Sequence, residues 1–498
     1  MNSGHAMRLA VIGLDGMSWR VLLRYVKYGV LKAVEKLLVH SVKGLNICIP
    51  PYTPPSWISI FTGVKPTSHR ILSFVKPSVF KNSISFRFVT SCDVKYPRLN
   101  EILAMNGLKG LVYNLYPSYP PSCMLLKNQV IIFDDLSPKE FIVPSKYSRY
   151  LQYFEKPKIL YKIGYKIGEE SKWLSLYEKY IERIVEGLLL LDSQLDLDFL
   201  ITIFKAPDTI MHHLPYIAMG KYNDKVANIF AIIDEFIDEI SKKYDVIVIV
   251  SDHGFEVYPF RVNVFGLLKM ATTISTVERV KLSLLNTLLG SKLIGLLTYA
   301  LLYCCPKLFV KLKNVAKSMV KSKEKSKAIT ATVRSLLNNI MVDPIDPNDS
   351  WILYSKDFCK LFQIYGVLKT YINHVLDYVE VVETLNWKAL MVRPKEGEAL
   401  VIDESLPKTL YFNFAWSSHS PIGIFIMYSK HYIPLNNHKL VIVENTDITP
   451  TILAHLNLPI GKHFEGKILK DLVCSSHIRI IDYMVRWKIL KKLYSTGL

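Results

Sequence analysis

Short apolar runs alternate with longer amphipathic segments in the first half of the chain. The runs predict strands that are buried on both faces, at residues 9–14, 45–49, 110–113, 199–204 and 246–250. The amphipathic segments repeat their apolar positions with helical spacing and predict helices, at residues 19–38, 55–62, 171–191 and 223–243. This alternation favours an α/β fold with a mostly parallel central sheet and helices on both of its faces.

The alternation stops after residue 255. Residues 282–305 are apolar and predict helix, residues 307–327 are rich in lysine, and the strand pattern returns at 410–414 and 423–428. The pattern therefore predicts a core interrupted by an inserted, helix-rich cap. In chain order, the first core part, the cap and the second core part with its C-terminal helix are residues 1–255, 256–404 and 405–498.

Polar residues that suit metal binding follow two of the predicted strands directly. Asp252 and His253 come after the strand at 246–250, and Gly254 then lets the chain turn away. Asp15 follows the first predicted strand in the same way. The carboxyl ends of strands are where open α/β sheets hold their ligands, so we expect these side chains to lie close together.

Two further segments supply the same chemistry. Asp208 follows the strand at 199–204, and His212 comes four residues later, a spacing that places both side chains on one face of a helical turn. His419 precedes the apolar run at 422–427. Carboxylates and imidazoles without a thiolate suit a pair of Zn²⁺ or Mn²⁺ ions. A salt bridge or an ordinary loop histidine would explain each residue alone, but their joint placement favours a metal site.

Thr53 is a candidate nucleophile. It has prolines on both sides and lies where the predicted strand at 45–49 passes into the predicted helix at 55–62. A hydroxyl at a helix N-terminus lies in a partly positive field, and metal coordination can activate it. A threonine that caps the helix is the simpler interpretation. The two interpretations are compatible, because capping geometry would also direct the hydroxyl at a metal.

In their order, these blocks resemble the alkaline phosphatase superfamily, and most closely its branch of type I phosphodiesterases and nucleotide pyrophosphatases. The resemblance covers most of residues 8–255 and 405–472. The matching blocks are Gly-Leu-Asp15-Gly, Thr53-Pro-Pro, Thr62-Gly63 through His69, Pro-Asp208-x-x-x-His212, Ser-Asp252-His253-Gly, Ser-His419 and the closing stretch at 446–453. The resemblance implies a hydrolase that acts on phosphoester bonds.

The resemblance also implies a role for each matching position. It places two metal ions, usually zinc, on either side of the phosphorus, which suits an in-line phosphoryl transfer. One ion would be held by Asp15, Thr53, Asp252 and His253, and the other by Asp208, His212 and His419. Thr53 would attack the phosphorus and form a phospho-threonine that water then hydrolyses.

The expected substrate is small and phosphorylated, such as a nucleotide, and is cleaved at a phosphodiester or pyrophosphate bond. A doubly charged monoester would need a further neutralising group, and the sequence shows no third set of carboxylates. Phe74 stands at or near the place of the family's phosphoryl-binding asparagine, and Arg70 replaces a usual glycine. Asn114 is a candidate for substrate binding and would otherwise be a turn residue. Arg70 would clamp a phosphate or, more simply, face solvent.

Three alternatives remain open. A phosphomonoesterase of the same superfamily shares the ligands. A phosphoglycerate mutase-like phosphotransferase also shares them, but in that group the insertion follows the nucleophile, whereas here it follows Asp252 and His253. The sulfatases need a cysteine or serine nucleophile in a block that Thr53 and its neighbours do not match. Outside the enzymes, a membrane-peripheral binding protein would use the basic cap.

The net charge of +19 would steer anionic substrates toward the protein. The lysines at 307–327 would also favour anionic headgroups, so we expect a peripheral contact with an anionic membrane. The apolar stretch at 293–305 is shorter than the ~20 residues that a membrane span needs. No helix-turn-helix pattern or interleaving of aromatic and basic residues is present, so specific nucleic-acid binding is not expected.

The seven cysteines are scattered without metal-binding spacing. Cys304 and Cys305 lie in an apolar stretch, which predicts buried thiols rather than a disulfide. Together with the lack of a signal peptide at the start of this sequence, this favours a reducing cytoplasm.

Overall fold

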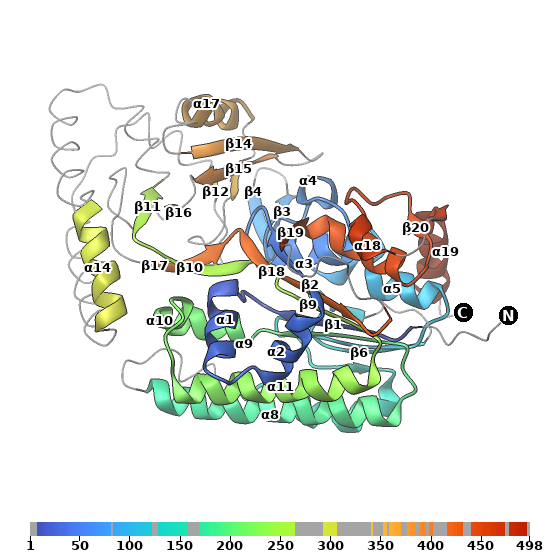
Figure 1. Ribbon diagram of the computed structural model, residues 1–498. Helices are drawn as coiled ribbons and strands as arrows, with labels where there is room; N and C mark the ends of the chain where they lie inside the picture. The colour runs from blue at the N-terminus through green and yellow to red at the C-terminus, as the bar shows by residue number, and fades with distance from the viewer. Residues whose placement is uncertain are drawn as a thin grey trace, which may run out of the picture.

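The computed structural model of the chain is shown in Figure 1, coloured from blue at the N-terminus to red at the C-terminus. The residues that the structure describes are 7–80, 83–121, 128–157, 169–263, 292–305, 340–341, 352–355, 358–369, 376–383, 388–394, 398–401, 416–431, 440–473 and 478–495.

The described residues build a central nine-stranded sheet in the order β19-β2-β18-β9-β1-β8-β5-β6-β7. Its strands are β1 (Leu9–Leu14), β2 (Ser41–Ile47), β5 (Gly110–Tyr113), β6 (Gln129–Ile132), β7 (Ile142–Val143), β8 (Phe199–Phe204), β9 (Val246–Val250), β18 (Ile422–Ser429) and β19 (Leu440–Glu444). The block from β9 to β6 is parallel, whereas β18 runs antiparallel to both of its neighbours and β7 runs antiparallel to β6. The predicted α/β fold with a mostly parallel sheet is therefore confirmed.

Helices cover both faces of this sheet (Figure 1). On one face lie α1 (Trp19–Lys27), α2 (Lys32–Val39), α8 (Glu170–Gln194), α9 (Ala206–His213) and α11 (Asp224–Lys243). On the other lie α3 (Thr53–Thr62), α5 (Leu99–Met105), α18 (Ile448–His455) and α19 (Tyr483–Ser495). Within β1, Ala10 and Ile12 belong to the first of these two cores and Val11 belongs to the second. Because successive side chains face opposite layers and both layers are apolar, the strand is apolar throughout.

The helix predicted at residues 19–38 is in fact two helices, α1 and α2. Gly29 has a φ of +73°, a backbone conformation that glycine adopts at little cost, and it ends the first helix. The second helix then starts at an angle to the first, and its first backbone N–H groups bind a side chain of α11. Asp234 accepts these hydrogen bonds from Ala33 at 2.7 Å and from Val34 at 2.9 Å. Helical spacing continues across the break, so it did not reveal the turn.

The chain between β9 and β18 contains more strand than the predicted helix-rich cap would. Its described elements are β10 (Gly254–Tyr258), β11 (Phe260–Asn263), α14 (Lys292–Cys304), β12 (Ile340–Met341), β13 (Ile352–Ser355), α17 (Phe358–Lys369), β14 (Leu376–Glu383), β15 (Lys388–Pro394), β16 (Glu398–Val401) and β17 (Trp416–Ser420). Strands β12, β13, β15 and β14 form an antiparallel sheet. Leu72 of the core packs against Ile352 and Met391 of that sheet. The inserted segment therefore lies against the core, while its boundaries stay a prediction.

Parts of this segment lie outside the described residues. They include residues 282–291 of the predicted helix, the lysine-rich stretch at 307–327 and the strand predicted at 410–414. Among the described residues, no helix is both long enough and apolar enough to cross a membrane.

The cysteines differ from the expectation in two respects. Cys304 and Cys305 are free but exposed, because they lie at the end of α14, on a side that the core does not cover. Cys92 is disulfide-bonded. The expectation of buried thiols without a disulfide therefore does not hold for these cysteines. The cytoplasmic location stays a prediction.

Candidate active site

The residues predicted as metal ligands converge at one edge of the central sheet. Strands β9, β1 and β8 are parallel neighbours, so their carboxyl ends meet there. Each end delivers at least one ligand candidate. Asp252 and His253 follow β9, Asp15 follows β1, and Asp208 lies on α9 directly after β8. The sequence pattern of strand ends therefore becomes a cluster in space.

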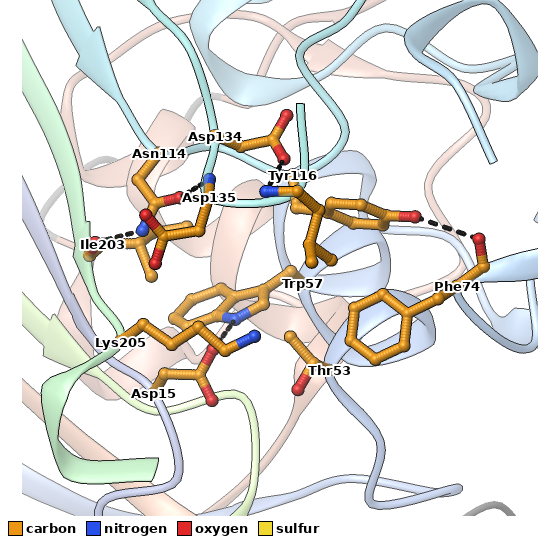
Figure 2. Close-up of a pocket in the computed structure, with 11 residues that line it drawn as sticks. Asp15, Thr53, Trp57, Phe74, Asn114, Tyr116, Asp134, Asp135, Ile203 and Lys205 are labelled. Carbon is orange, nitrogen blue, oxygen red and sulfur yellow. Dashed lines mark hydrogen bonds between the residues drawn. The ribbon is translucent and has the colours of Figure 1, made fainter. Parts of the chain in front are cut away.

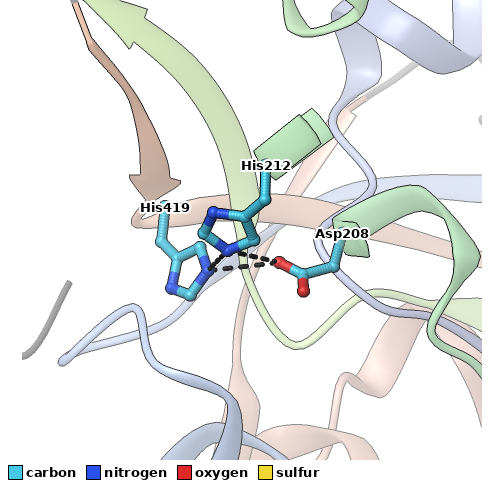
Figure 3. A group of neighbouring side chains, drawn as sticks. All are labelled: Asp208, His212 and His419. Carbon is cyan, nitrogen blue, oxygen red and sulfur yellow. Dashed lines mark hydrogen bonds and ion pairs between the residues drawn. The ribbon is translucent and has the colours of Figure 1, made fainter. Parts of the chain in front are cut away.

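Asp208, His212 and His419 form the first group (Figure 3). His212 lies one turn after Asp208 on α9, and its Nε2 is 3.3 Å from Asp208 Oδ1. His419 Nε2 lies 3.2 Å from the same oxygen and 3.0 Å from His212 Nε2. One carboxylate oxygen and two imidazole nitrogens that face a common point are ligands that a divalent cation can take together.

His419 reaches this group from a strand, not from a loop as the simpler interpretation had it. It lies on β17, which pairs with β10 and places His419 opposite Phe255. The ring Nδ1 lies 3.1 Å from the carbonyl oxygen of Pro51. A carbonyl only accepts, so Nδ1 carries the proton and Nε2 keeps its lone pair toward Asp208.

Asp15, Asp252, His253 and Thr53 form the second group. His253 Nε2 lies 3.2 Å from Asp252 Oδ2 and 3.7 Å from Asp15 Oδ1. Its Nδ1 donates to the carbonyl oxygen of Gly254 at 3.0 Å, so Nε2 is again the nitrogen with a free lone pair. The two groups adjoin, because the His253 and His419 rings stack at 3.8 Å and Asp208 lies close to both Asp15 and His253.

Gly254 is required for close strand packing and not for the predicted turn. It begins β10, and a Cβ at this position would lie 2.0 Å from the carbonyl oxygen of Ile422. Only glycine therefore lets the start of β18 approach so closely behind the Asp252–His253 pair.

Thr53 is the first residue of α3, and its predicted capping role falls to Tyr52, whose backbone is extended. The Thr53 side chain is 5% exposed and its Oγ1 lies 3.3 Å from His253 Nε2. The hydroxyl therefore points at the second group instead of capping the helix. The matching block Thr62-Gly63 through His69 begins at the last residue of α3. The chain then returns to this helix, because Ser59 Oγ and His69 Nε2 are 3.1 Å apart.

The electrostatics of the cluster call for added positive charge. Burial, and then the neighbouring Asp208, raise the pKa of Asp15 to about 7. Burial, and then Asp15, raise the pKa of Asp252 well above its ordinary value. Burial of the His253 imidazole lowers its pKa well below the usual value. Asp15 Oδ1 and Asp252 Oδ2 are buried without a hydrogen-bond partner, a costly state that a bound cation would relieve.

A cavity opens beside Thr53 and Asp15 (Figure 2). Its lining is Asp15, Thr53, Trp57, Phe74, Asn114, Tyr116, Asp134, Asp135, Leu136, Ile203 and Lys205. Asn114, the predicted substrate ligand, lines it with a φ of +57°. Its Nδ2 donates to the carbonyl oxygen of Ile203 and its Oδ1 accepts from the Asp135 N–H, both at 2.9 Å. This bonding favours the turn interpretation, and a role in substrate binding stays a prediction.

Two other departures from the family pattern can be placed. Phe74 is buried and contributes its ring to the cavity wall. Arg70 is exposed and has a φ of +61° at the end of α4 (Pro66–His69), a conformation that explains the glycine usual at this position. It faces solvent, as the simpler interpretation expected.

Lys205 is a residue that the sequence reading missed. It follows β8, and its side chain points into the cavity near Asp15 and Thr53 (Figure 2). Burial lowers its pKa, but the carboxylates, Asp15 and Asp208 foremost, outweigh this and hold the pKa above the ordinary value. A lone lysine directly after the strand-like run at 199–204 was the available signal.

Comparisons with known proteins place this site in a family. The sequence profile described as type I phosphodiesterase / nucleotide pyrophosphatase matches residues 9–288, more than half of the chain. No curated protein sequence matches significantly.

Several solved structures are similar in fold. The alkaline phosphatase PafA covers 95% of this chain and 100% of its own, at a TM-score of 0.50 and 13% identity. Phosphonoacetate hydrolase from Sinorhizobium meliloti 1021, solved with phosphonoformate, covers 89% of this chain and 94% of its own, at a TM-score of 0.48 and 12% identity. Murine ectonucleotide pyrophosphatase / phosphodiesterase 5 covers 91% and 95%, at a TM-score of 0.47 and 11% identity. At such identities the similarity concerns the fold alone. The profile match shows that the chain is a phosphoester hydrolase of the type I phosphodiesterase / nucleotide pyrophosphatase family.

Proposed function

We propose that the protein cleaves a phosphodiester or pyrophosphate bond through a phospho-threonine at Thr53, with two divalent metal ions, zinc or manganese, as cofactors. The observation that carries this proposal is the position of the Thr53 hydroxyl, 3.3 Å from His253 Nε2 at the junction of the two groups. The superfamily is one of metal-dependent enzymes, which fits the Asp and His groups of this chain.

The residues present fit two metal ions. Asp208, His212 and His419 would hold one ion, and Asp15, Asp252, His253 and Thr53 would hold the other. Imidazole Nε2 atoms of rings whose Nδ1 donates to a backbone carbonyl, and carboxylate oxygens buried without a hydrogen bond, are the donors that Zn²⁺ and Mn²⁺ take. When bound, the ions would supply positive charge that activates the threonine hydroxyl and neutralises the phosphoryl oxygens.

The side chains of the protein would aim and protect the reacting groups. Thr53 Oγ1 would form a bond to phosphorus as the bond from phosphorus to the leaving oxygen breaks, and the threonine proton would pass to the leaving oxygen or to solvent. Water would then attack phosphorus: its oxygen would bond to phosphorus as the bond to Oγ1 breaks, and one of its protons would restore the threonine hydroxyl. The Trp57 indole N–H binds Asp15 Oδ2 at 3.2 Å, and the Gly16 N–H binds Asp252 Oδ1 at 3.2 Å. These hydrogen bonds fix both carboxylates before substrate arrives.

The substrate class rests on the family and on charge. Bonds between phosphorus and oxygen in small phosphorylated compounds such as nucleotides are the expected targets, and the net charge of +19 would attract them. The test is hydrolysis of bis(p-nitrophenyl) phosphate and p-nitrophenyl phosphate by the protein after metal loading. Failure to turn over either ester with both metals bound would rule out the proposal.

We also propose a peripheral contact with an anionic membrane, because α14 exposes an apolar surface. Leu296, Leu297 and Tyr303 on this helix are 52%, 60% and 47% exposed. The Lys221 ammonium lies 3.5 Å from the centroid of the Tyr303 ring, so positive charge borders the apolar residues. An apolar face with a basic border fits the interface of a negatively charged bilayer. The lysine-rich sequence at 307–327 follows directly.

This contact predicts binding to vesicles of mixed phosphatidylcholine and phosphatidylserine. Leu297→Glu should lower the sedimented fraction at least about fivefold, because it places a negative charge in the apolar face. Val485→Glu is the matched control, since Val485 is 57% exposed on α19, at the opposite end of the molecule (Figure 1). Equal sedimentation of both variants, or none of the wild type, would contradict the contact.

A further inference from the structure

Lys205 is the one cation among the described residues that line the cavity beside Thr53. Its side chain is half-buried, and Figure 2 shows its ammonium directed into the space between Asp15, Thr53 and Phe74. The ammonium lies 5.5 Å from the centroid of the Phe74 ring. It forms neither a hydrogen bond nor an ion pair with any residue that the structure describes. The ammonium is therefore a hydrogen-bond donor beside the nucleophile that has no acceptor among the described residues.

The other side-chain nitrogens that line the cavity already donate a hydrogen bond to the protein. The Trp57 indole N–H binds Asp15 Oδ2 at 3.2 Å, and the Asn114 side-chain amide binds the carbonyl oxygen of Ile203 at 2.9 Å. Phe74 offers an apolar ring. Among the described side-chain nitrogens of this wall, that of Lys205 has no acceptor in the described part of the protein, so it can donate to an oxygen of a bound phosphoryl group.

Charge argues for the same role. The charges of Asp15, Asp208, Asp135 and Asp252 act on Lys205, in that order. In the proposed function, metal ions would neutralise Asp15, Asp208 and Asp252, and would leave Asp135 as the remaining carboxylate. Asp135 forms no ion pair with Lys205 among the described residues, so an anion that contacts the ammonium directly would still be favourable for this half-buried cation. A phosphoryl group at Thr53 brings that anion to the cavity.

We propose that Lys205 Nζ binds a non-bridging oxygen of the phosphoryl group that Thr53 attacks, and thereby favours a terminal phosphoryl group over a diester. A terminal phosphoryl group, as at the end of a pyrophosphate chain, carries up to two negative charges, whereas a diester carries one. The attraction to a fixed cation grows in proportion to that charge. This inference rests on the proposed function and narrows it to pyrophosphate bonds that are attacked at the terminal phosphorus.

Two substrates with one leaving group test the charge dependence. p-Nitrophenyl phosphate is a dianion and methyl p-nitrophenyl phosphate is a monoanion, so only the charge and the methyl group differ. Lys205→Gln should lower kcat/KM for the dianion by about 100-fold, equal to ~2.7 kcal/mol, and for the diester by about tenfold or less. Lys205→Arg keeps the charge and should keep most of the activity toward the dianion. Equal losses on both substrates, or an unchanged rate on the dianion, would overturn the inference.

Binding of inorganic phosphate gives a readout that does not depend on turnover. Calorimetric titration of the metal-loaded protein should show at least tenfold weaker binding in Lys205→Gln than in the wild type, at unchanged metal content and melting temperature. A fall in metal content would instead show that Lys205 supports the metal site, and would contradict the inference. If the metal-loaded wild type turned over no ester, the proposed function would fail, whereas the phosphate titration would still decide whether Lys205 binds a phosphoryl group.

Discussion

Replacement of Thr53 by alanine is expected to lower kcat toward p-nitrophenyl phosphate esters by at least about 10⁴-fold, because it removes the atom that attacks phosphorus. The Thr53 side chain is almost fully buried at the start of α3, and its hydroxyl contacts His253 rather than the helix backbone. The loss of the hydroxyl should therefore leave the fold in place. The rate is measured with metal-loaded protein, alongside its melting temperature.

Two variants control this experiment. Ser56→Ala removes another buried hydroxyl of α3, which donates to the Pro50 carbonyl oxygen at 3.2 Å and is not among the proposed metal ligands, and should keep most of the activity. Thr53→Ser keeps the nucleophilic oxygen and should keep a measurable rate. A Thr53→Ala protein within tenfold of the wild-type rate would show that Thr53 is not the nucleophile.

Removal of one ligand from either group is expected to remove one metal ion. His419→Ala and Asp15→Ala should each reduce the bound zinc from about two ions per chain to about one, and lower kcat/KM at least about 100-fold. Each residue belongs to a different group, so the remaining group should keep its ion. Metal content is measured by mass spectrometry of the desalted protein after zinc loading.

The control for this loss is His455→Ala. His455 is also a buried histidine, but it bonds to Ser429 Oγ at 3.1 Å and to the Leu472 carbonyl oxygen at 2.7 Å, away from both groups. It should keep both metal ions. If His419→Ala and Asp15→Ala retained two ions, the assignment of the two groups would be wrong.

The central sheet was predictable because both of its faces are buried. Strands β1, β5 and β9 are apolar throughout, and β8 is apolar except for Thr202, since neighbouring residues such as Val11 and Ile12 enter different cores. The break between α1 and α2 was not visible, because a single glycine ends the first helix while the apolar spacing continues. Helix propensity and the spacing of apolar residues predict where a helix lies, but they do not predict where it ends.

The site was predictable as far as strand ends could place it. Asp15, Asp208 and Asp252 follow parallel neighbours, so topology alone brings them together. The approach of His419 depends on the pairing of β17 with β10 across the whole insertion, which local sequence does not encode. The role of Lys205 was not predictable, because the tertiary structure and not the local sequence directs its side chain into the cavity. A lone lysine after a strand is otherwise an ordinary surface residue.

The inserted segment was the least predictable part. Helix α14 lies in the apolar stretch from which helix was expected, but the antiparallel sheet of β12 to β15 was not anticipated. Strands such as β14 contain several charged residues and lack the continuous apolar character of the core strands. Their pairing stabilises them more than their own sequence does.

The most direct test of the central claim is the dependence of phosphoester hydrolysis on metal ions. The protein is stripped with a chelator, desalted, and assayed on bis(p-nitrophenyl) phosphate and p-nitrophenyl phosphate before and after the addition of Zn²⁺ or Mn²⁺. The account predicts negligible turnover of the stripped protein and recovery of turnover as the second metal ion binds, with no such recovery in Thr53→Ala. Hydrolysis that survives stripping unchanged, or no hydrolysis of either ester with two ions bound, would contradict it.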